Sequence, residues 1–564
     1  MITSPAERID EFTRQGWWGD ATLHGLLWEN SAVHPERLAV ADQPDRLDWT
    51  GSEPLRLNYA QLRNAAVNLA CQLLDRGIEA DDALIVQLPN ITELVVVYYA
   101  ASAIGAILSP VPVQYGRHEL GKAASVLNPA AVIAMERCKD LQLAENARAA
   151  MPPGVPVFSF GPAGDGGPES LSIEPDHRPA NADRLREHES RHPVDANSVL
   201  TICWTSGTTG TPKGVPRSHN MWFAIARNSA AAGSYEDSDR LLNPFPLVNM
   251  GALGGFLFPS MLHACTLVLH QPFDPGVFLK QMEAERITFT IAPPAVLNQL
   301  AKAEDLWNQF DFSALRCIGS GSAPLSPWMI RTFAEQYGKE VVNFYGSNEG
   351  ISLFSTPDTS PDAETRASMF PRMGCADMPW RGITHQMVGT RIVTAGTEEE
   401  ITRPGEPGEL LFYGPTIFDG YLGTPNDDVF TSDGWFRTGD LVEICGEPPH
   451  YYRIVGRCKD IINRGGMKIS PAEIDILLEG FPGLLEGAVC AYPDERLGEK
   501  ICACVVPRPD SEPPTLEQIT AYLLEQGLAK FKLPERILVL PQLPRNPMNK
   551  VQRDQLEKMV IDHG

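Results

Sequence analysis

The sequence predicts an α/β protein with a large N-terminal domain of parallel sheets and flanking helices, a β-rich subdomain, and a small α+β C-terminal domain. Three observations support this class. Helical patterns alternate with short apolar strands from about Leu57 to Val342, short strands and turns follow from Thr384 to Tyr452, and the pattern changes again after Gly456. The 564 residues also exceed what one hydrophobic core usually holds, so several structural units are expected.

The N-terminal region contains one clear helical pattern and several buried strands. Residues Tyr59 to Arg76 follow a helical period, whereas the stretch from Gly161 to Pro193 has no clear period and is expected to be a surface excursion. Short apolar runs predict strands at Ala83–Leu88, Ala131–Met135, Cys265–Leu269 and Ile287–Ile291.

The composition excludes several classes of protein. The net charge of −24 and the pI near 4.9 argue against nucleic acid or anionic lipid as the main partner. Eleven scattered cysteines without zinc spacing, and a start without a secretion signal, favour a reduced cytoplasmic compartment. Two apolar stretches, Leu84 to Val113 and Gly251 to Leu269, could be mistaken for membrane spans, but prolines and glycines interrupt them and both are expected to be buried.

The C-terminal hundred residues predict a compact α+β unit. Ser470-Pro-Ala-Glu473 has the pattern of a capping box with proline at the first helical position, so a helix is expected to begin at Pro471. Cys502 and Cys504 would lie on one face of a strand as ordinary small apolar residues. The other expected elements are strands at Gly487–Tyr492, Ile501–Val506 and Arg536–Leu540 and a helix at Thr515–Gln526.

A polar glycine-rich loop follows a predicted buried strand, Val199 to Trp204. In Thr205-Ser-Gly-Thr-Thr-Gly-Thr-Pro-Lys-Gly214 the glycines permit close approach of the backbone, the hydroxyls donate hydrogen bonds and Lys213 adds a positive charge, which together suit a polyphosphate. The loop does not have the Walker P-loop pattern, because Thr211 and Pro212 separate Gly210 from Lys213, and this argues against a P-loop motor or GTPase. A flexible Gly/Thr linker is the alternative interpretation.

This loop resembles the phosphate-binding signature of the adenylate-forming superfamily, and further signatures of that family follow in its order over essentially the whole chain. In Asn343-Phe-Tyr-Gly-Ser-Asn-Glu-Gly350 the resemblance implies that Tyr345 packs on adenine and Glu349 supports Mg²⁺; in Arg437-Thr-Gly-Asp-Leu441 it implies that Asp440 binds the ribose. Taken alone, Tyr345 would be a core aromatic and Thr-Gly-Asp a turn. The resemblance implies Lys550, Thr209 and Glu349 as catalytic residues, and nucleotide binding by Thr205, Ser206, Gly207, Thr208, Gly210, Lys213, Tyr345, Gly346, Ser347, Asp440 and Arg457.

The resemblance also implies a mobile C-terminal domain. Gly456-Arg-Cys-Lys-Asp460 is similar to the family's interdomain hinge, with Lys459 as the pivot, although a solvated loop is the simpler interpretation of those residues. The implied organisation is an AMP- and acyl-binding domain over 1–456 with its β-rich subdomain at about 384–456, a hinge at 457–460 and the small domain at 461–564. A thiol tunnel is expected at Gly465 and Gly466.

The implied acyl pocket consists of Asn249, Met250, Gly251, Gly319, Gly321 and Ser322. It contains no acidic residue, which argues against an α-amino acid as substrate. Other segments look most like stand-alone 2,3-dihydroxybenzoate and salicylate AMP ligases and acyl-CoA synthetases, but Met250 and Gly251 stand where the catechol enzymes have asparagine and tyrosine. An aryl, alicyclic or other bulky apolar acid is therefore expected, with Met250 as ordinary core packing the alternative.

The predicted reaction uses ATP and Mg²⁺ to join a carboxylic acid to AMP with release of pyrophosphate, after which the acyl group passes to coenzyme A or to the phosphopantetheine of a carrier protein. The nucleophilic carboxylate is already ionised, so the site must supply alignment and positive potential rather than a general base. Two other classes stay open: a luciferase-like oxygenase on the same scaffold, and a nucleotide-binding regulator without turnover.

Overall fold

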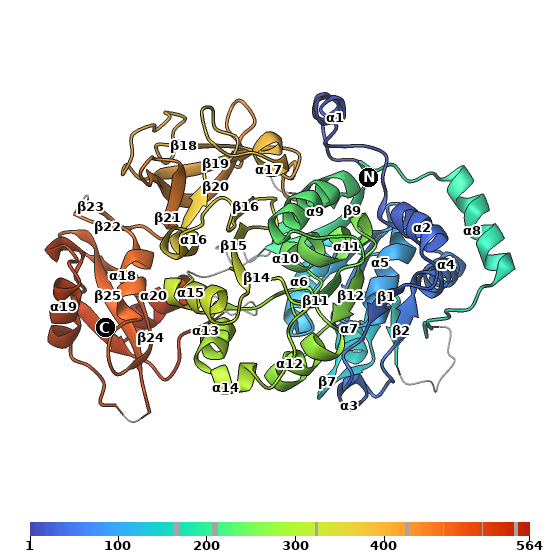
Figure 1. Ribbon diagram of the computed structural model, residues 1–564, viewed down its shortest axis with the longest axis horizontal. Helices are drawn as coiled ribbons and strands as arrows, with labels where there is room; N and C mark the ends of the chain where they lie inside the picture. Colours follow the sequence, from blue (N-terminus) through green and yellow to red (C-terminus); the bar gives the residue numbers. More distant parts are fainter. Residues whose placement is uncertain are drawn as a thin grey trace. The chain divides into compact units, whose positions relative to one another are not determined.

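The computed structural model describes residues 1–161, 169–205, 213–321, 325–423, 428–465, 467–509, 511–545 and 551–563 (Figure 1). The chain forms two compact units, one of Met1–Gly389 with Phe412–Phe430 and the other of Thr390–Leu411 with Thr431–Gly564. The structure has the predicted α/β class. The second unit contains most of the β-rich part as well as the C-terminal part, and the expected domain boundary near residue 456 stays a prediction.

The first unit contains two largely parallel sheets. The eight-stranded sheet has the order β16-β15-β14-β13-β11-β12-β1-β2, and the six-stranded sheet has the order β10-β9-β4-β3-β5-β8; the antiparallel pairs β15–β16, β1–β2 and β9–β10 lie at their edges. The strands of the first sheet are β1 (Leu38–Ala41), β2 (Arg56–Asn58), β11 (Arg240–Asn243), β12 (Thr266–Leu269), β13 (Phe289–Ile291), β14 (Cys317–Gly321), β15 (Glu340–Gly346) and β16 (Ser352–Ser355). Those of the second are β3 (Ala83–Gln87), β4 (Ile107–Pro110), β5 (Ala131–Met135), β8 (Val157–Phe160), β9 (Val199–Thr205) and β10 (Lys213–Ser218).

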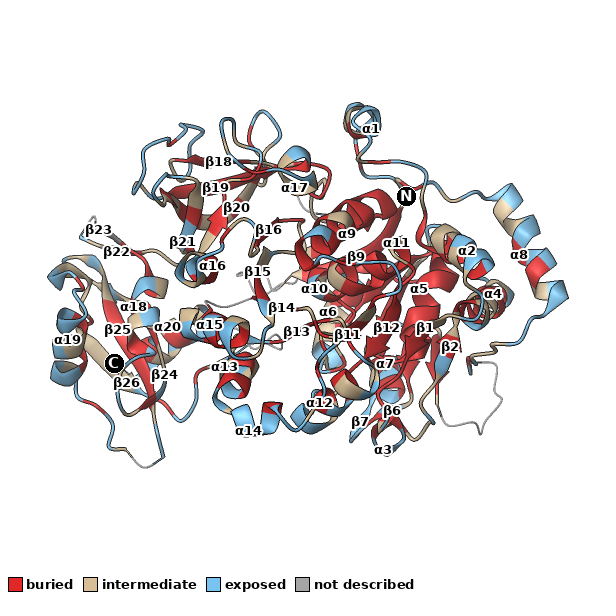
Figure 2. Ribbon diagram, viewed as in Figure 1, coloured by how far each residue is buried: buried red, intermediate tan, exposed pale blue. Residues whose placement is uncertain are grey.

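The inner strands read as continuous apolar runs because helices cover both faces of a parallel sheet. Figure 2 shows most strands of both sheets as buried, and every residue of β4, β5 and β8 is buried. The helices of this unit are α1 (Ala6–Arg14), α2 (Leu23–Val33), α3 (Arg46–Thr50), α4 (Tyr59–Asp75), α5 (Thr92–Ile104), α6 (Arg117–Leu127), α7 (Leu143–Ala150), α8 (Pro179–Arg191), α9 (His219–Gly233), α10 (Met250–Ala252), the π-helix η1 (Leu253–Leu257), α11 (Phe258–Leu262), α12 (Pro275–Ala284), α13 (Pro294–Lys302), α14 (Glu304–Trp307), α15 (Pro327–Glu335), α16 (Ala363–Ser368) and α17 (Ile383–Met387). Short strands β6 (Arg137–Cys138), β7 (Leu141–Gln142) and β17 (Met369–Pro371) complete it.

The predicted helix at Tyr59 is α4, which begins after a capping box formed by Asn58 and Gln61. The apolar stretch from Leu84 to Val113 forms β3, the entirely buried α5, and β4, as predicted. Of the helices that the structure describes, none combines the length and the apolarity needed to cross a bilayer.

The expectation of an irregular excursion from Gly161 to Pro193 is wrong in its second half. Helix α8 occupies Pro179–Arg191, with proline in its first turn and only Ala182 and Leu185 buried. A helix that buries so narrow an apolar stripe consists mostly of polar and charged residues, and these hid its period in the sequence.

In the second unit, β18 (Gly389–Val393), β19 (Gly408–Tyr413), β20 (Phe436–Cys445) and β21 (Tyr451–Arg457) form a sheet in the order β21-β20-β19-β18. The C-terminal elements include every predicted strand and helix. They are β22 (Ile462–Arg464), β23 (Met467–Ile469), α18 (Pro471–Leu478), β24 (Leu484–Asp494), β25 (Gly498–Pro507), α19 (Leu516–Glu525), the 3₁₀ turn η2 (Lys530–Lys532), β26 (Arg536–Val539) and α20 (Arg553–Asp562). Strand β25 pairs with β22, β24 and β26.

Helix α18 begins at Pro471 as predicted, but the predicted capping box is wrong. The Ser470 hydroxyl makes no cap bond and donates instead to the Val455 carbonyl, while Glu473 accepts from Lys532 Nζ at 2.7 Å. These tertiary partners replaced the local ones. Cys502 and Cys504 are fully buried with apolar neighbours, which confirms their predicted packing role.

Candidate active site

The two ends of the predicted phosphate loop lie side by side because β9 and β10 pair in antiparallel fashion, with Thr205 opposite Lys213. Residues 206–212, which include Ser206, Gly207, Thr208, Thr209 and Gly210, lie outside the described part of the chain. Lys213 Nζ lies 4.5 Å from the centroid of the Tyr421 ring, a cation–π distance. The strand pair therefore brings a lysine to the edge of the sheet where the loop begins and ends.

The predicted adenine and magnesium segment is the end of β15 and the turn into β16. Tyr345 is half-buried, with its ring 5.5 Å from that of Phe370, and Gly346 is exposed. Ser347 Oγ is buried and has no hydrogen-bond partner within the described residues. Glu349 Oε1 accepts a hydrogen bond from the Tyr421 hydroxyl at 2.9 Å.

Asn348 joins three predicted segments of the site. Its Nδ2 donates to the carbonyl of Trp204 at 3.0 Å, at the entry to the phosphate loop, and its Oδ1 accepts from the Met250 amide at 2.9 Å, in the predicted acyl pocket. Because an amide side chain both donates and accepts, one residue holds the strand end and the helix start together. The phosphate, adenine and acyl segments thus meet around a single side chain.

A fully buried cation lies under the same turn. Arg217 donates to three carbonyls, those of Asn348 (2.9 Å), Thr416 (2.7 Å) and Met221 (3.3 Å), and its guanidinium lies over the Trp222 ring. No carboxylate within the described residues forms an ion pair with it, and burial lowers its pKa to about 10. The turn before Glu349 is therefore anchored by a buried cation that main-chain carbonyls and the Trp222 ring stabilise.

The predicted acyl residues cluster at the start of α10 and the end of β14. Asn249 caps α10, its Oδ1 accepting from the Ala252 amide at 3.3 Å, and Met250 is buried. A Cβ on Gly346 would lie 3.0 Å from Met250 Cε, and a Cβ on Gly319 would lie 2.7 Å from the Phe344 ring. A side chain at position 319 would overlap the Phe344 ring, and one at position 346 would fit only if Met250 and the Ile351 carbonyl gave way slightly. Ser322 lies outside the described residues.

These groups fit a nucleotide with a divalent cation. The buried, unpartnered Ser347 hydroxyl, the exposed backbone at Gly346, the Glu349 carboxylate and the Lys213 ammonium are a donor, an open main chain, a hard oxygen ligand and a positive charge. Within the described ranges, no cluster of three or more His, Cys, Asp or Glu residues marks another metal site.

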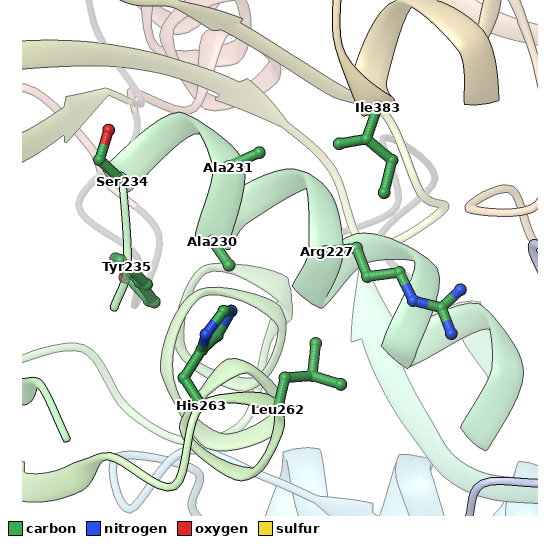
Figure 3. A pocket seen from close by; sticks show the side chains of 8 residues that line it. All are labelled: Arg227, Ala230, Ala231, Ser234, Tyr235, Leu262, His263 and Ile383. Atoms are coloured by element: carbon green, nitrogen blue, oxygen red, sulfur yellow. The ribbon is translucent and has the colours of Figure 1, made fainter. Parts of the chain in front are cut away.

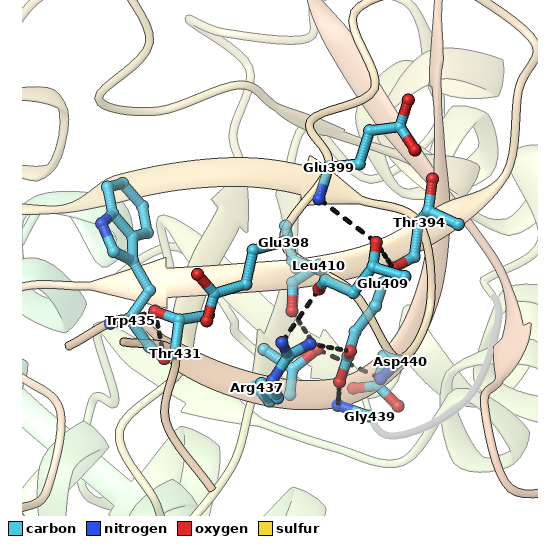
Figure 4. Close-up of polar contacts among 12 residues, drawn as sticks. Thr394, Glu398, Glu399, Glu409, Leu410, Thr431, Trp435, Arg437, Gly439 and Asp440 are labelled. Carbon is cyan, nitrogen blue, oxygen red and sulfur yellow. Dashed lines mark hydrogen bonds and ion pairs between the residues drawn. The ribbon is translucent and has the colours of Figure 1, made fainter. Parts of the chain in front are cut away.

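The second unit holds the predicted ribose residues next to one another. Asp440 and Arg457 are cross-strand partners on β20 and β21, and Arg457 Nε donates to Asp440 Oδ1 at 3.0 Å. Figure 4 shows how the turn before Asp440 is held: Glu409 accepts from Arg437 Nη1 (2.9 Å) and from the Gly439 amide (3.2 Å). The position of Asp440 is thus built into the strand pair.

The described residues Lys459, of the predicted hinge, and Gly465, of the predicted tunnel, lie in turns. Lys459 is exposed in the turn between β21 and β22, and Gly465 has a φ of +59° in the turn between β22 and β23, where its amide donates to Leu497 O at 2.7 Å. Gly466 and the predicted catalytic Lys550 lie outside the described residues.

Comparisons with known proteins decide the family. The AMP-binding enzyme family matches residues 27–422, and the AMP-binding enzyme C-terminal domain matches residues 473–550. The chain belongs to the AMP-binding enzyme family. It is an adenylate-forming acid–thiol ligase, and the resemblance found in the sequence is confirmed.

Among similar members of the AMP-binding enzyme family is a salicylyl-CoA synthase / salicylate adenylyltransferase of Streptomyces sp, 31% identical over 99% of this chain and 97% of its own. An indoleacetate–CoA ligase of Aromatoleum aromaticum is 32% identical over 89% of this chain and 93% of its own. The crystal structure of ATP-bound MatB from Rhodopseudomonas palustris superposes with a TM-score of 0.77 at 26% identity, covering 97% of this chain and 100% of that one.

The structure also has a crevice of about 300 Å³, and Figure 3 shows the side chains that line it. It is lined by Arg227, Ala230, Ala231, Ser234, Tyr235, Leu262, His263 and Ile383. None of the predicted site residues that the structure describes borders it.

Sequence reasoning missed Asn348, Arg217 and Tyr421 as parts of the site. Asn348 stood inside a recognised segment without an assigned role, and Arg217 follows the phosphate loop by only a few residues. Tyr421 carries no local signal, since only the fold brings it to Glu349 and Lys213.

Proposed function

We propose that this enzyme activates a carboxylic acid with ATP, forming an acyl-adenylate and pyrophosphate, and then transfers the acyl group to a thiol. The observation that carries the proposal is the meeting of the phosphate, adenine and acyl segments at Asn348, with Lys213 and Glu349 joined through Tyr421. A hydroxyl without a hydrogen-bond partner among the described residues, a carboxylate and a lysine at one sheet edge are groups that a nucleotide and a metal ion would use.

In the first step, a carboxylate oxygen attacks the α-phosphate of ATP and the bond to pyrophosphate breaks. Negative charge spreads over the phosphate oxygens, so positive groups held in place stabilise the transition state. We assign Lys213 and the loop 205–214 to the phosphates, Tyr345, Gly346 and Ser347 to the adenosine, and Asp440 with Arg457 to the ribose.

Lys550 is assigned to the α-phosphate region and Glu349 to Mg²⁺. When bound, Mg²⁺ supplies charge neutralisation at the phosphates. Thr209, within the loop, is assigned as a hydroxyl donor to the same phosphates.

In the second step, a thiolate attacks the carbonyl of the acyl-adenylate and AMP leaves. We propose that residues 461–564 turn about Lys459, within a hinge at 457–460, and bring a thiol past Gly465 and Gly466. The acceptor is coenzyme A or a carrier-protein phosphopantetheine. One site would serve both steps, because the first product stays bound while the second nucleophile enters.

The substrate is proposed to be an aryl, alicyclic or other bulky apolar acid. Gly319 lies against Phe344, whose ring lies 6.5 Å from Phe289 and 4.8 Å from Phe354, so the acyl segments rest on aromatic side chains. Neither Asn249–Gly251 nor Gly319–Gly321 offers a carboxylate to an amino acid's ammonium. The names of the two relatives, salicylate and indoleacetate ligases, agree with an aryl acid.

The test is exchange of labelled pyrophosphate into ATP with a panel of acids: benzoate, salicylate, indole-3-acetate, cyclohexanecarboxylate, octanoate and phenylalanine. An aryl or alicyclic acid should give the highest kcat/KM, and phenylalanine should give none. Exchange with phenylalanine alone would contradict the substrate assignment. Failure of exchange with every acid would contradict the function.

A variant pair tests the assigned lysine. Lys550→Ala should lower exchange by about 10²-fold or more, while transfer from a preformed adenylate changes much less. Lys558→Ala removes an exposed lysine of α20 and is the matched control. Equal losses in both half-reactions would contradict the role of Lys550, and acid-dependent O₂ uptake would instead favour a luciferase-like oxygenase.

A further inference from the structure

We propose that Tyr421 positions the metal and phosphate groups of the site, and that the N-terminal segment Ser4–Trp18 holds Tyr421 in place through residues 414–421, here called the strap. The inference rests on the proposed function, because it assigns the strap a role at the site formed by Lys213 and Glu349. It adds a positioning residue, and a remote segment that acts through it, to the adenylation step.

The strap is irregular and largely buried, and side chains satisfy its main chain. Five consecutive carbonyls accept hydrogen bonds from side chains elsewhere in the first unit. The donors are Arg8 to Gly414 O (3.0 Å), Trp18 to Pro415 O (3.2 Å), Arg217 to Thr416 O (2.7 Å), and Arg8 to Ile417 O (2.6 Å) and Phe418 O (3.4 Å). Buried carbonyls without partners are costly, so these donors determine the path of the strap.

The N-terminal segment also holds the strap by charge. Arg8 Nη1 donates to Asp419 Oδ1 at 2.7 Å, and Ser4 Oγ donates to Asp419 Oδ2 at 2.5 Å. The side chains of Arg8 and Asp419 are only 15% and 6% exposed, so this ion pair is poorly screened by solvent. A single guanidinium thus reaches three carbonyls and one carboxylate, which its planar fork of donors permits and a lysine could not match.

On its other side the strap touches the site. The Phe418 amide donates to Glu349 O at 2.9 Å, and the amide of Leu422, directly after the strap, donates to Gly214 O at 2.9 Å. Gly350 has a φ of +115°, and a Cβ there would lie 1.9 Å from Thr416 O. The strap therefore lies against both the magnesium turn and the end of the phosphate loop.

Tyr421 stands between two opposite charges. Its hydroxyl donates to Glu349 Oε1 at 2.9 Å while its ring faces Lys213 Nζ at 4.5 Å. Among the described residues, the two charges thus each contact Tyr421. We infer that Tyr421 orients the carboxylate and keeps the ammonium from pairing with it, so that each stays available to metal and phosphate.

The N-terminal segment precedes the part of the chain that matches the AMP-binding enzyme family, which begins at residue 27. The N-terminal residues that hold the strap, Ser4, Arg8 and Trp18, therefore lie outside the residues that the family match includes. Deleting such a segment would damage more than the strap, so single substitutions are the informative test.

The first experiment compares the wild type with Tyr421→Phe, which removes the hydroxyl and keeps the ring. The dissociation constant of ATP is measured by calorimetry across a series of Mg²⁺ concentrations and in EDTA. The Mg²⁺ concentration for half-maximal ATP affinity should rise about tenfold, the loss expected for one hydrogen bond to a charged group, while affinity in EDTA stays unchanged. Tyr337→Phe is the control, because it removes a tyrosine hydroxyl that donates to Leu300 O at 3.3 Å, from a ring that packs against hydrophobic residues outside the site.

The second experiment compares Arg8→Lys with Arg316→Lys by hydrogen exchange of the nucleotide-free proteins. Arg316 likewise grips a carboxylate, Asp239, and a carbonyl, Ser234 O, so it matches the chemistry of the Arg8 change. The amides of Phe418 and Leu422 should exchange about tenfold faster in Arg8→Lys only. The Mg²⁺ requirement of Arg8→Lys should rise in the same direction as that of Tyr421→Phe.

An unchanged Mg²⁺ requirement in Tyr421→Phe, or an equal loss of ATP affinity in EDTA, would overturn the role of Tyr421. Unchanged hydrogen exchange at the strap in Arg8→Lys would overturn the proposal that the N-terminal segment holds the strap. These readouts do not need turnover. If the wild type bound ATP with Mg²⁺ yet exchanged pyrophosphate with no acid, the proposed function would fail while the binding series still decided the inference.

Discussion

Arg217 offers a sharp test of how a buried charge is stabilised in this fold. It is fully buried, and in the folded state its pKa is lowered from 12.5 to about 10 by burial. At 1.36 kcal/mol per pH unit, the charged form is destabilised by about 3 kcal/mol. Three main-chain carbonyls compensate for this, at 2.7 to 3.3 Å.

Two substitutions of Arg217 distinguish the contribution of its charge from that of its several hydrogen-bond donors. Arg217→Met removes the buried charge and orphans two carbonyls, those of Asn348 and Thr416, at about 2 kcal/mol each, because Met221 O also accepts within α9; a net loss of about 1 kcal/mol is expected. Arg217→Lys keeps the buried charge and still orphans one of these two carbonyls, so a loss of about 2 kcal/mol is expected. The charge-conserving change should therefore do no better than the neutral one.

The assay is urea unfolding followed by circular dichroism. Arg227→Lys is the control, because Arg227 donates to one carbonyl, that of Trp17 at 2.6 Å, which a lysine can also reach. It should cost under about 1 kcal/mol. If Arg217→Lys were as stable as the wild type while Arg217→Met was not, charge rather than donor geometry would be the stabilising feature and the reasoning would be refuted.

Three further predictions concern other parts of the molecule. Burial lowers the pKa of His219 to about 3 and that of His24 to about 4, so between pH 6.5 and pH 5 only the unfolded chain takes up protons at these two histidines. The free energy of unfolding should therefore fall by about 2 kcal/mol per histidine, or about 4 kcal/mol for the pair, between pH 7.5 and pH 5. In His219→Gln, measured by urea unfolding, this pH-dependent fall should be about half as large. Asp440→Ala should weaken ATP binding at least tenfold by calorimetry and leave pyrophosphate binding unchanged, since the carboxylate is assigned to the ribose. Gly350→Ala should lower the melting temperature by well over 5 °C or abolish soluble expression, because the added Cβ overlaps a carbonyl, whereas Gly255→Ala, with nothing within 4 Å, should change it little.

A specific result would contradict each of these three predictions. A stability independent of pH from 7.5 to 5 would mean that the buried histidines are hydrated. Equal weakening of ATP and pyrophosphate binding would contradict the assignment of Asp440 to the ribose. A stable Gly350→Ala protein would mean that the turn can move away from the Thr416 carbonyl at little cost.

Much of the fold followed from local pattern. Buried parallel strands such as β3 and β5 are continuous apolar runs, and α4 has both a period and a capping box, so short stretches carried enough information. The order of the motifs along the chain was sufficient to indicate the family. Helix α8 escaped detection because its buried stripe consists of only two residues.

The candidate site was predictable only where its residues lie inside a motif. Thr205, Lys213, Tyr345, Ser347, Glu349, Asp440 and Arg457 belong to such segments, and the strand pairs place Thr205 beside Lys213 and Asp440 beside Arg457. Ser470 shows the opposite case, because a valid capping pattern gave way to a carbonyl that only the folded chain brings near.

The sequence by itself determined the class of fold, the family and the segments that bear the chemistry, because apolar periodicity and short motifs are local properties of the chain. Only the tertiary structure decided that Asn348 joins the phosphate and acyl segments, that Arg217 is a buried cation without a carboxylate partner among the described residues, and that Arg8 holds the strap carrying Tyr421. Such contacts join residues up to about four hundred positions apart, as between Arg8 and Asp419, and their energy depends on burial and geometry that no local pattern records.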